Sequence, residues 1–216
     1  REFATYEPII EDDVMEEEEM TPSSSPKGGT QMSFGEQLRH VVSRTGNTVR
    51  YSNFSMGYFY RPSGTYLVGF LTTGHFTQGS GNEILKGSTG QAIGSVLHKI
   101  DSGSVDASYV LSYDGVSIPT FSSGYVTNND YSLRASVTLY GYKNTAPRTG
   151  VIRNTSIITG NNSDCVAATY SSEDGDSGGA IGMGDRAAGI HVGSGFLNGE
   201  QVGLFCKHTN IVANIG

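Results

Sequence analysis

The 216-residue sequence predicts an all-β fold of short antiparallel strands, arranged as a barrel or a sandwich. From about residue 49 onward, ten or so apolar runs of strand length alternate with turn sequences such as PSG, YDG, TNND and NGE. The chain also contains 30 glycines, no Trp and 36% apolar residues, and this mixture suits strands and tight turns better than long helices.

Ten runs are expected to form strands: 51–60, 65–75, 91–100, 106–113, 134–142, 150–158, 164–170, 180–184, 186–193 and 201–208. One short helix is expected before them, from about Phe34 to Ser43. Ser33 and Glu36 have the spacing of a capping box. Leu38, Val41 and Val42 would form one apolar face of the helix.

Charge divides the chain into two regions. Residues 1–30 hold nine acidic and two basic side chains, which account for the whole net charge of −7. We expect them to form an acidic leader or linker that is disordered or serves as a pro-segment, followed by a folded domain over 31–216. The balanced charge of that domain provides no basic face for nucleic acid, and no apolar run approaches the ~20 residues that span a membrane.

The strongest chemical signal is the pentapeptide GDSGG at 175–179. A serine hydroxyl is a poor nucleophile, so it needs a base to take its proton and donors aimed at the oxyanion that forms on attack. Glycines on both sides of Ser177 allow a sharp turn that points two N–H groups at one spot. The pattern predicts Ser177 as nucleophile and the amides of Gly175 and Ser177 as its oxyanion hole.

Two further side chains complete the expected machinery. His75 ends the apolar run YLVGFLTTGH and is expected to act as the base. Asp106 opens the run DASYVLS and is expected to fix the tautomer of His75 and stabilise its charged form. Asp101 and Asp114 are rivals for this role, but they lie in a Gly/Ser loop and a YDG turn. The order along the chain is His, Asp, Ser.

These anchors resemble those of chymotrypsin-like serine proteases, most closely the streptogrisin, α-lytic protease and glutamyl endopeptidase branch. TTGH resembles that branch's TAGH, residues 150–179 resemble the hairpin that leads to its serine, and AAGIHVGSG resembles the strand that lines its specificity pocket. The resemblance covers roughly residues 45–216. It implies a trypsin-like serine protease fold of two six-stranded antiparallel β-barrels, with His75 and Asp106 on the first and Ser177 on the second.

The sequence departs from this family at positions that support the site. Val192 stands where many members have a Ser whose hydroxyl supports the catalytic acid, so another donor or a water molecule must support Asp106. Asp176 precedes the nucleophile and would be costly to bury without a cationic partner. Arg134 and Lys143 are both candidates, and the sequence does not decide between them.

The cysteines also differ from the family pattern. The chain has only Cys165 and Cys206, so the pair that usually surrounds the catalytic His is missing. The two residues could form one disulfide or remain two buried thiols, and their spacing does not decide. Two cysteines do not make a metal site.

The segment GIHVGSG carries the expected specificity. His191 resembles the pocket His of glutamyl endopeptidases and that of picornavirus-like 3C proteases, which prefer Gln. His191, Gly193 and Ser194 are therefore expected to bind substrate, with a preference for Glu, or for Gln or Asp, before the scissile bond. Glu173 and Asp174 oppose this expectation, because they lie close to the pocket wall in the sequence and would repel an acidic side chain.

The resemblance implies a secreted, monomeric serine endopeptidase that hydrolyses polypeptide substrates without a metal or cofactor. The small number of cysteines, however, suits a cytosolic protein as well as a secreted protein with few disulfides. Two alternatives stay open. One is a viral 3C-like protease that processes polyproteins, and the other is a catalytically silent binding module on the same fold. If the pocket does accept acidic residues, Glu16 to Glu19 offer self-cleavage sites upstream of the domain.

Overall fold

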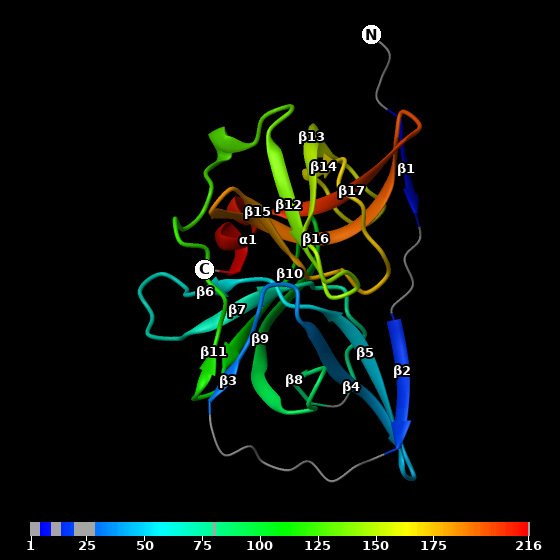
Figure 1. Cartoon of the computed structure of the whole chain (residues 1–216), viewed down its shortest axis with the longest axis vertical. Coiled ribbons are helices and arrows are strands. Elements are labelled where there is room, and N and C mark those ends of the chain that lie inside the picture. Colours follow the sequence, from blue (N-terminus) through cyan, green and yellow to red (C-terminus); the bar gives the residue numbers. More distant parts are fainter. Residues whose placement is uncertain (1–4, 10–13, 20–28, 80, 216) are drawn as a thin grey trace.

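The C-terminal half of the chain folds into a closed barrel, seen in the upper part of the computed structural model in Figure 1. The structure describes residues 5–9, 14–19, 29–79 and 81–215. The barrel strands run in the order β16-β15-β12-β13-β14-β17, and pairing of β16 with β17 closes it. Their bounds are β12 Ser136–Tyr140, β13 Arg148–Ile157, β14 Cys165–Ala168, β15 Ala180–Met183, β16 Arg186–Leu197 and β17 Glu200–Lys207.

The N-terminal half forms an eight-stranded sheet in the order β2-β5-β4-β8-β9-β10-β7-β6, below the barrel in Figure 1. Its strands are β2 Val14–Glu19, β4 Gln37–Thr45, β5 Thr48–Ser55, β6 Phe59–Tyr60, β7 Gly69–Thr72, β8 Glu83–Lys86, β9 Ala92–Ser102 and β10 Val105–Ser112. The remaining strands are β1 Tyr6–Ile9, on the edge of β16, and the parallel pair β3 Thr30–Gln31 and β11 Val116–Ser117.

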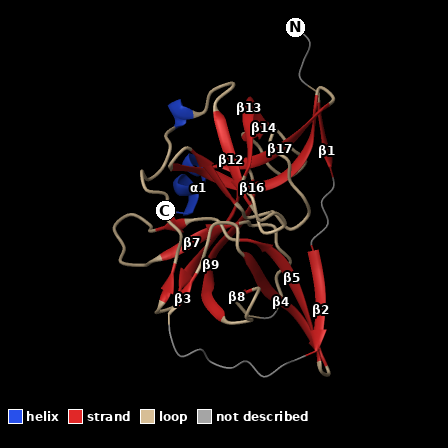
Figure 2. Cartoon of the chain, in the orientation of Figure 1, coloured by secondary structure: helices blue, strands red, loops and turns tan. Residues whose placement is uncertain are grey.

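Strands dominate the chain, as Figure 2 shows, and the predicted all-β fold is confirmed. Each of the ten predicted runs overlaps an observed strand. The helices are a 3-10 turn, η1 Asn128–Asp130, and α1 His208–Ile215. No helix in the described part of the chain is both long and apolar enough to cross a membrane.

The predicted helix from Phe34 to Ser43 is wrong, because this segment forms a turn followed by β4. The two residues of the predicted capping box do interact, but they close only a turn. The Ser33 N–H donates to a Glu36 carboxylate oxygen at 3.0 Å, and Gly35 between them has φ +68°. Beyond it, β4 pairs with β5 and β8, and residues 37–40 alternate between half-buried and buried. Long-range strand pairing thus overrides the helical spacing of the apolar residues.

The expectation of a disordered leader does not hold for two stretches of residues 1–30. β1 pairs with β16, and β2 pairs with β5 from Val14 opposite Asn53 to Glu19 opposite Thr48. Arg39 offsets part of the acidic charge of β2, since its guanidinium lies 2.8 Å from Glu16 and 2.9 Å from Glu18. The rest of the leader up to residue 28, apart from residue 5, lies outside the described residues, so the boundary near residue 30 stays a prediction.

A shared hydrophobic core joins the two halves. Its buried side chains come from both sheets and from α1, and include Tyr58, Leu71 and Tyr109 on one side and Ala180, Ile190 and Ile211 on the other. At the start of α1, His208 is buried with its Nδ1 atom 2.8 Å from the Tyr58 hydroxyl. This packing fixes the two halves relative to each other and so fixes any site between them.

The cysteine question that the sequence left open is settled in favour of two free, buried thiols. Cys206 lies in the core between the two halves, where its thiol contacts the Ser104 carbonyl oxygen at 3.2 Å. Burial raises the pKa of the Cys165 thiol to about 12 and the pKa of the Cys206 thiol still further. Both are therefore protonated, unreactive thiols at neutral pH.

We expect native protein at pH 8 to resist alkylation by iodoacetamide, because both thiols are buried and protonated. In denaturant the intact mass should rise by two adducts without any reducing agent. Rapid labelling of native protein would contradict the burial, and labelling that requires prior reduction would contradict the free thiols.

Candidate active site

His75 and Asp106 are brought together by the pairing of β7 with β10. The register places Ser108 opposite Thr72, so Asp106 lies beside the loop that leaves β7 and carries His75. The Nδ1 atom of His75 is 2.5 Å from a carboxylate oxygen of Asp106. The predicted acid and base therefore share a hydrogen bond. Of the two rivals, Asp101 lies opposite Asp106 on β9, and Asp114 occupies an exposed turn.

Asp106 is almost fully buried, and three donors hold its other oxygen. The N–H groups of Gly74 and His75 donate to it at 2.6 and 3.1 Å, and the Thr73 hydroxyl donates at 3.1 Å. Thr73 thus supplies the hydroxyl that Val192 cannot, a role that sequence reasoning missed although Thr73 lies within TTGH. Gly74 is required here, since a Cβ at this position would lie 2.0 Å from the Ile100 carbonyl oxygen.

Ser177 lies in a turn that is hydrogen-bonded to the N-terminal sheet. The Ser55 N–H, at the end of β5, donates to the Ser177 carbonyl oxygen at 2.8 Å, and the Ser55 hydroxyl donates to the Gly175 carbonyl oxygen at 2.9 Å. The same hydroxyl accepts the Tyr142 N–H at 3.0 Å. One serine of the N-terminal sheet therefore orients the backbone on both sides of Asp176.

The glycines around Ser177 adopt conformations that favour glycine. Gly175 and Gly178 have φ angles of +98° and +88°. A Cβ at Gly175 would lie 2.6 Å from the Tyr142 hydroxyl oxygen, so the position is also closed to a side chain. Within the described residues, no acceptor takes the N–H of Gly175 or Ser177, whereas the Gly178 N–H donates to the His191 carbonyl oxygen. Two amides beside Ser177 are thus available to a bound group.

Asp176 is fully buried and paired with Arg148, which was neither of the predicted candidates. The Arg148 guanidinium donates to one carboxylate oxygen at 2.6 Å, and the Glu173 N–H donates to the same oxygen at 2.8 Å. Lys143 contributes only its backbone N–H, at 3.3 Å, and Arg134 lies in an exposed turn. Arg148 is the first residue of β13, so a strand of the barrel provides the cation that pairs with Asp176.

His191 is fully buried beside the nucleophile turn. Its Nδ1 atom lies 3.0 Å from the Tyr170 hydroxyl, and its Nε2 atom has no hydrogen-bond partner in the described structure. Burial lowers the pKa of His191 to about 4, so the ring is neutral at pH 7. If the Tyr170 hydroxyl donates to Nδ1, the proton of the neutral ring is on Nε2, as an unsatisfied donor.

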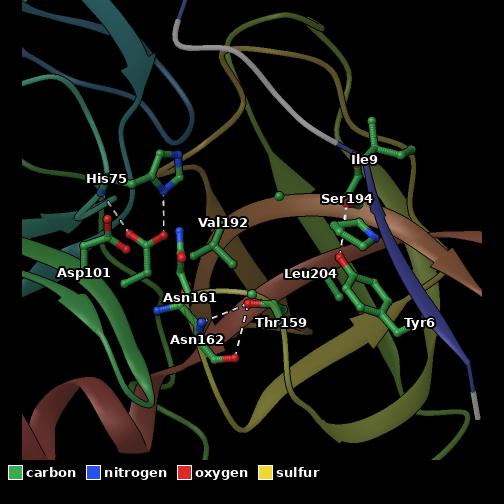
Figure 3. A pocket seen from close by; sticks show the side chains of 14 residues that line it. Tyr6, Ile9, His75, Asp101, Thr159, Asn161, Asn162, Val192, Ser194 and Leu204 are labelled. Carbon is green, nitrogen blue, oxygen red and sulfur yellow. Dashed lines mark hydrogen bonds and ion pairs between the residues drawn. The ribbon is translucent and has the colours of Figure 1, made fainter.

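A pocket of about 350 Å³ lies beside His75 and Asp106 (Figure 3). It is lined by Tyr6, Pro8, Ile9, His75, Asp101, Asp106, residues 159–162, Val192, Gly193, Ser194 and Leu204. Two of the three predicted substrate-binding residues, Gly193 and Ser194, therefore face it, whereas His191 does not line it. Glu173 and Asp174 are exposed and do not line this pocket.

No group of three or more His, Cys, Asp or Glu side chains in the described ranges is arranged to bind a metal ion. No protein-family model matches the sequence, and comparison with curated protein sequences finds no similar one. Similarity is found among solved structures.

Three of the similar structures illustrate the match. Cellulomonas bogoriensis chymotrypsin has a TM-score of 0.62 and 19% identity, over 86% of this chain and 96% of that chain. Thermobifida fusca protease A has a TM-score of 0.63 and 18% identity, over 87% and 97%. A glutamic acid specific serine protease, described as using a histidine triad in substrate binding, has a TM-score of 0.61 and 22% identity, over 76% and 92%.

These similarities show that the chain has the trypsin-like fold of the chymotrypsin-like serine proteases. The predicted fold is confirmed, with one difference in detail: the barrel in the C-terminal half has six strands, whereas the N-terminal sheet has eight. In that sheet β2 and β6 flank the six central strands.

Replacement of Arg148 by Met should destabilise the protein by about 3–5 kcal/mol, because it leaves the Asp176 carboxylate buried without its cation. Urea unfolding at pH 7 measures this change. The matched control is Arg148→Met combined with Asp176→Asn, which removes both charges and should lose less stability than the single variant. A single variant within about 1 kcal/mol of the wild type would refute the importance of the pair.

Proposed function

We propose that the protein is a serine endopeptidase in which Ser177, His75 and Asp106 form the catalytic triad. The hydrogen bond between His75 and buried Asp106 is the observation that carries this proposal, because it orients the ring and would stabilise its protonated form. Ser177 lies in a turn of the barrel that Ser55 of the N-terminal sheet holds, and no acceptor among the described residues takes the N–H of Gly175 or Ser177. These are the parts that acyl transfer requires.

In the proposed reaction, the Ser177 hydroxyl attacks the scissile carbonyl carbon while His75 takes its proton. The amides of Gly175 and Ser177 stabilise the oxyanion, and His75 then gives the proton to the leaving amine. Water, deprotonated by the same imidazole, hydrolyses the acyl-enzyme. Thr73 acts as a positioning residue, since its hydroxyl holds the acid and not the substrate.

We further propose a preference for Glu before the scissile bond. When the Tyr170 hydroxyl donates to Nδ1, the neutral His191 ring beside the nucleophile turn offers a buried Nε2–H donor that has no hydrogen-bond partner in the described structure, and Ser194 lines the pocket beside His75. Both can donate to a carboxylate oxygen. The glutamic acid specific protease among the similar structures supports this choice. An amide oxygen could accept the same bonds, so Gln is the alternative that the specificity experiment must separate.

Wild-type protein should hydrolyse a library of peptides, and Ser177→Ala should abolish that activity, because it removes the nucleophile. A peptidyl phosphonate should label the wild-type protein at Ser177, as peptide mapping would show. The Ser177→Ala variant also serves as the control for contaminating proteases. Folded protein that neither cleaves the library nor reacts with the phosphonate would favour a silent binding module.

Among peptides that differ only at the residue before the cut, the peptide with Glu at that position should be cleaved fastest. His191→Phe should reduce this preference, because it removes the hydrogen-bond donor while keeping an aromatic ring. Values of kcat/KM for Glu, Gln, Asp and Lys peptides measure the effect. Retained labelling of Ser177 in the variant would show that its site is still folded. A preference of the wild type for Lys or Arg would refute the acidic pocket.

A further inference from the structure

One edge of β16 carries two strands with a gap between them. β17 pairs with β16 over residues 189–197, so β15 and β1 must both lie along the opposite edge. On that edge β15 and the nucleophile turn are hydrogen-bonded to β16 up to His191, and β1 pairs with residues 194–197. Between them lie Val192 and Gly193, with which no strand in the described part of the chain pairs on this edge.

The gap is the part of β16 nearest to the proposed chemistry. Val192 and Gly193 line the same pocket as His75, and Figure 3 shows Val192 beside it. Under the proposed function, the residue before the scissile bond binds near His191. The residues that precede it in a bound peptide must then extend along β16 away from His191. Beyond Gly193 that path is occupied by β1.

β1 runs in the direction that such a peptide would take. It is antiparallel to β16, from Tyr6 opposite Leu197 to Ile9 opposite Ser194, so its chain runs toward the gap. A peptide whose residues before the cut add to this edge also runs toward the gap, because its scissile carbonyl must reach Ser177. With one peptide residue opposite each residue of β16, β1 lies where the third and earlier residues before the cut would lie.

The surface of β16 is shaped to hold β1 closely. A Cβ at Gly195 would lie 2.5 Å from the Tyr6 ring and 2.6 Å from the Glu7 carbonyl oxygen, so the missing side chain is what admits the strand. The Tyr6 ring packs against the small hydrophobic cluster that contains Leu197. Its hydroxyl donates to the Ser194 carbonyl oxygen at 3.2 Å, as Figure 3 shows.

A turn residue anchors the far end of β1. The Asn198 side-chain oxygen accepts the Thr5 N–H at 2.9 Å, and the Asn198 N–H donates to the Thr5 carbonyl oxygen at 2.9 Å. At the near end, Pro8 and Ile9 line the pocket that His75 also lines. A strand held in this way bounds the space in which a substrate can bind beside His75.

We propose that β1 is an internal inhibitory strand, which occupies the part of β16 that a long peptide substrate needs. Substrate residues beyond the second before the cut can then pair with β16 only after β1 has left. The proposal rests on the proposed endopeptidase function and concerns the regulation of that site. The competing ligand is an extended polypeptide, which binds through backbone hydrogen bonds along a strand edge.

Inhibition of this kind depends on the length of the substrate. A peptide with two residues before the cut fits opposite Val192 and Gly193 and leaves β1 in place. A longer peptide gains backbone pairing only in molecules that have released β1, so its apparent affinity is reduced by the fraction of molecules in that state. The position of β1 should therefore change kcat/KM for long peptides much more than for short ones.

The test holds and loosens β1 in one full-length protein, Tyr6→Ala combined with Glu7→Cys and Phe196→Cys. Glu7 and Phe196 are opposite each other in the register, both are exposed and neither lines the pocket, so an oxidised pair would tie β1 to β16. Tyr6→Ala weakens the docking of β1 once that bond is reduced. The two native cysteines are buried and do not compete for the new bond.

Two Glu peptides, with two and with six residues before the cut, are assayed in each redox state. In reduced protein the longer peptide should have a kcat/KM at least about tenfold above that of the shorter one, and in oxidised protein the two values should be about equal. The matched control lacks Phe196→Cys and should favour the longer peptide in both redox states.

The outcomes separate this proposal from the proposed function. An equal advantage of the longer peptide in oxidised and reduced protein overturns the proposal and leaves the endopeptidase function standing. Failure of the introduced cysteines to bond in folded protein also overturns it, because this contradicts the position of β1. If the triple variant does not fold, Tyr6→Ala alone should increase the advantage of the longer peptide over the wild type, and an unchanged advantage overturns the proposal. Wild-type protein that cleaves neither peptide overturns the endopeptidase function and the proposal with it.

Discussion

The contact between Ser55 and the turn around Ser177 is the constraint on which the rest of the site depends. The proposed base and acid belong to the N-terminal sheet, and the proposed nucleophile belongs to the barrel, so their geometry is only as fixed as the junction between them. Ser55 makes three hydrogen bonds at that junction, with Ser177, Gly175 and Tyr142. The shared hydrophobic core behind it prevents the halves from sliding.

Each side of this junction contains one buried carboxylate, and hydrogen-bond donors surround both of them. Asp106 and Asp176 are both buried carboxylates, and each is held by backbone N–H groups together with side-chain donors. The side-chain donors are the His75 imidazole and the Thr73 hydroxyl for Asp106, and the Arg148 guanidinium for Asp176. Burial without these donors would be prohibitive, so both anions lock the local backbone into one conformation. Rigidity of the site is thus a consequence of charge burial.

The sequence predicted the strands of residues 49–208 because their apolar runs and turn residues are local signals. It also predicted that His75, Asp106 and Ser177 belong together, and the structure brings the first two into contact. It could not predict Arg148, because the partner of a buried charge is set by strand register and not by spacing. The helix expected at 34–43 failed for a related reason: β4 gains its hydrogen bonds from β5 and β8, which local periodicity does not encode. β1 and β2 were hidden by an acidic composition typical of disorder.

Burial of His208 and His191 makes the stability of this fold depend on pH in the acid range. Each ring is neutral when folded, with a pKa lowered by burial to about 4 from an ordinary value of 6.5. Between those values the unfolded chain takes up more protons than the native protein, so acidification favours unfolding across that window. The His208 ring lies at the junction between the halves, and the backbone of His191 is hydrogen-bonded to the turn that follows Ser177. Mild acid is therefore expected to lower the stability of the fold through rings that lie where the two halves must stay aligned.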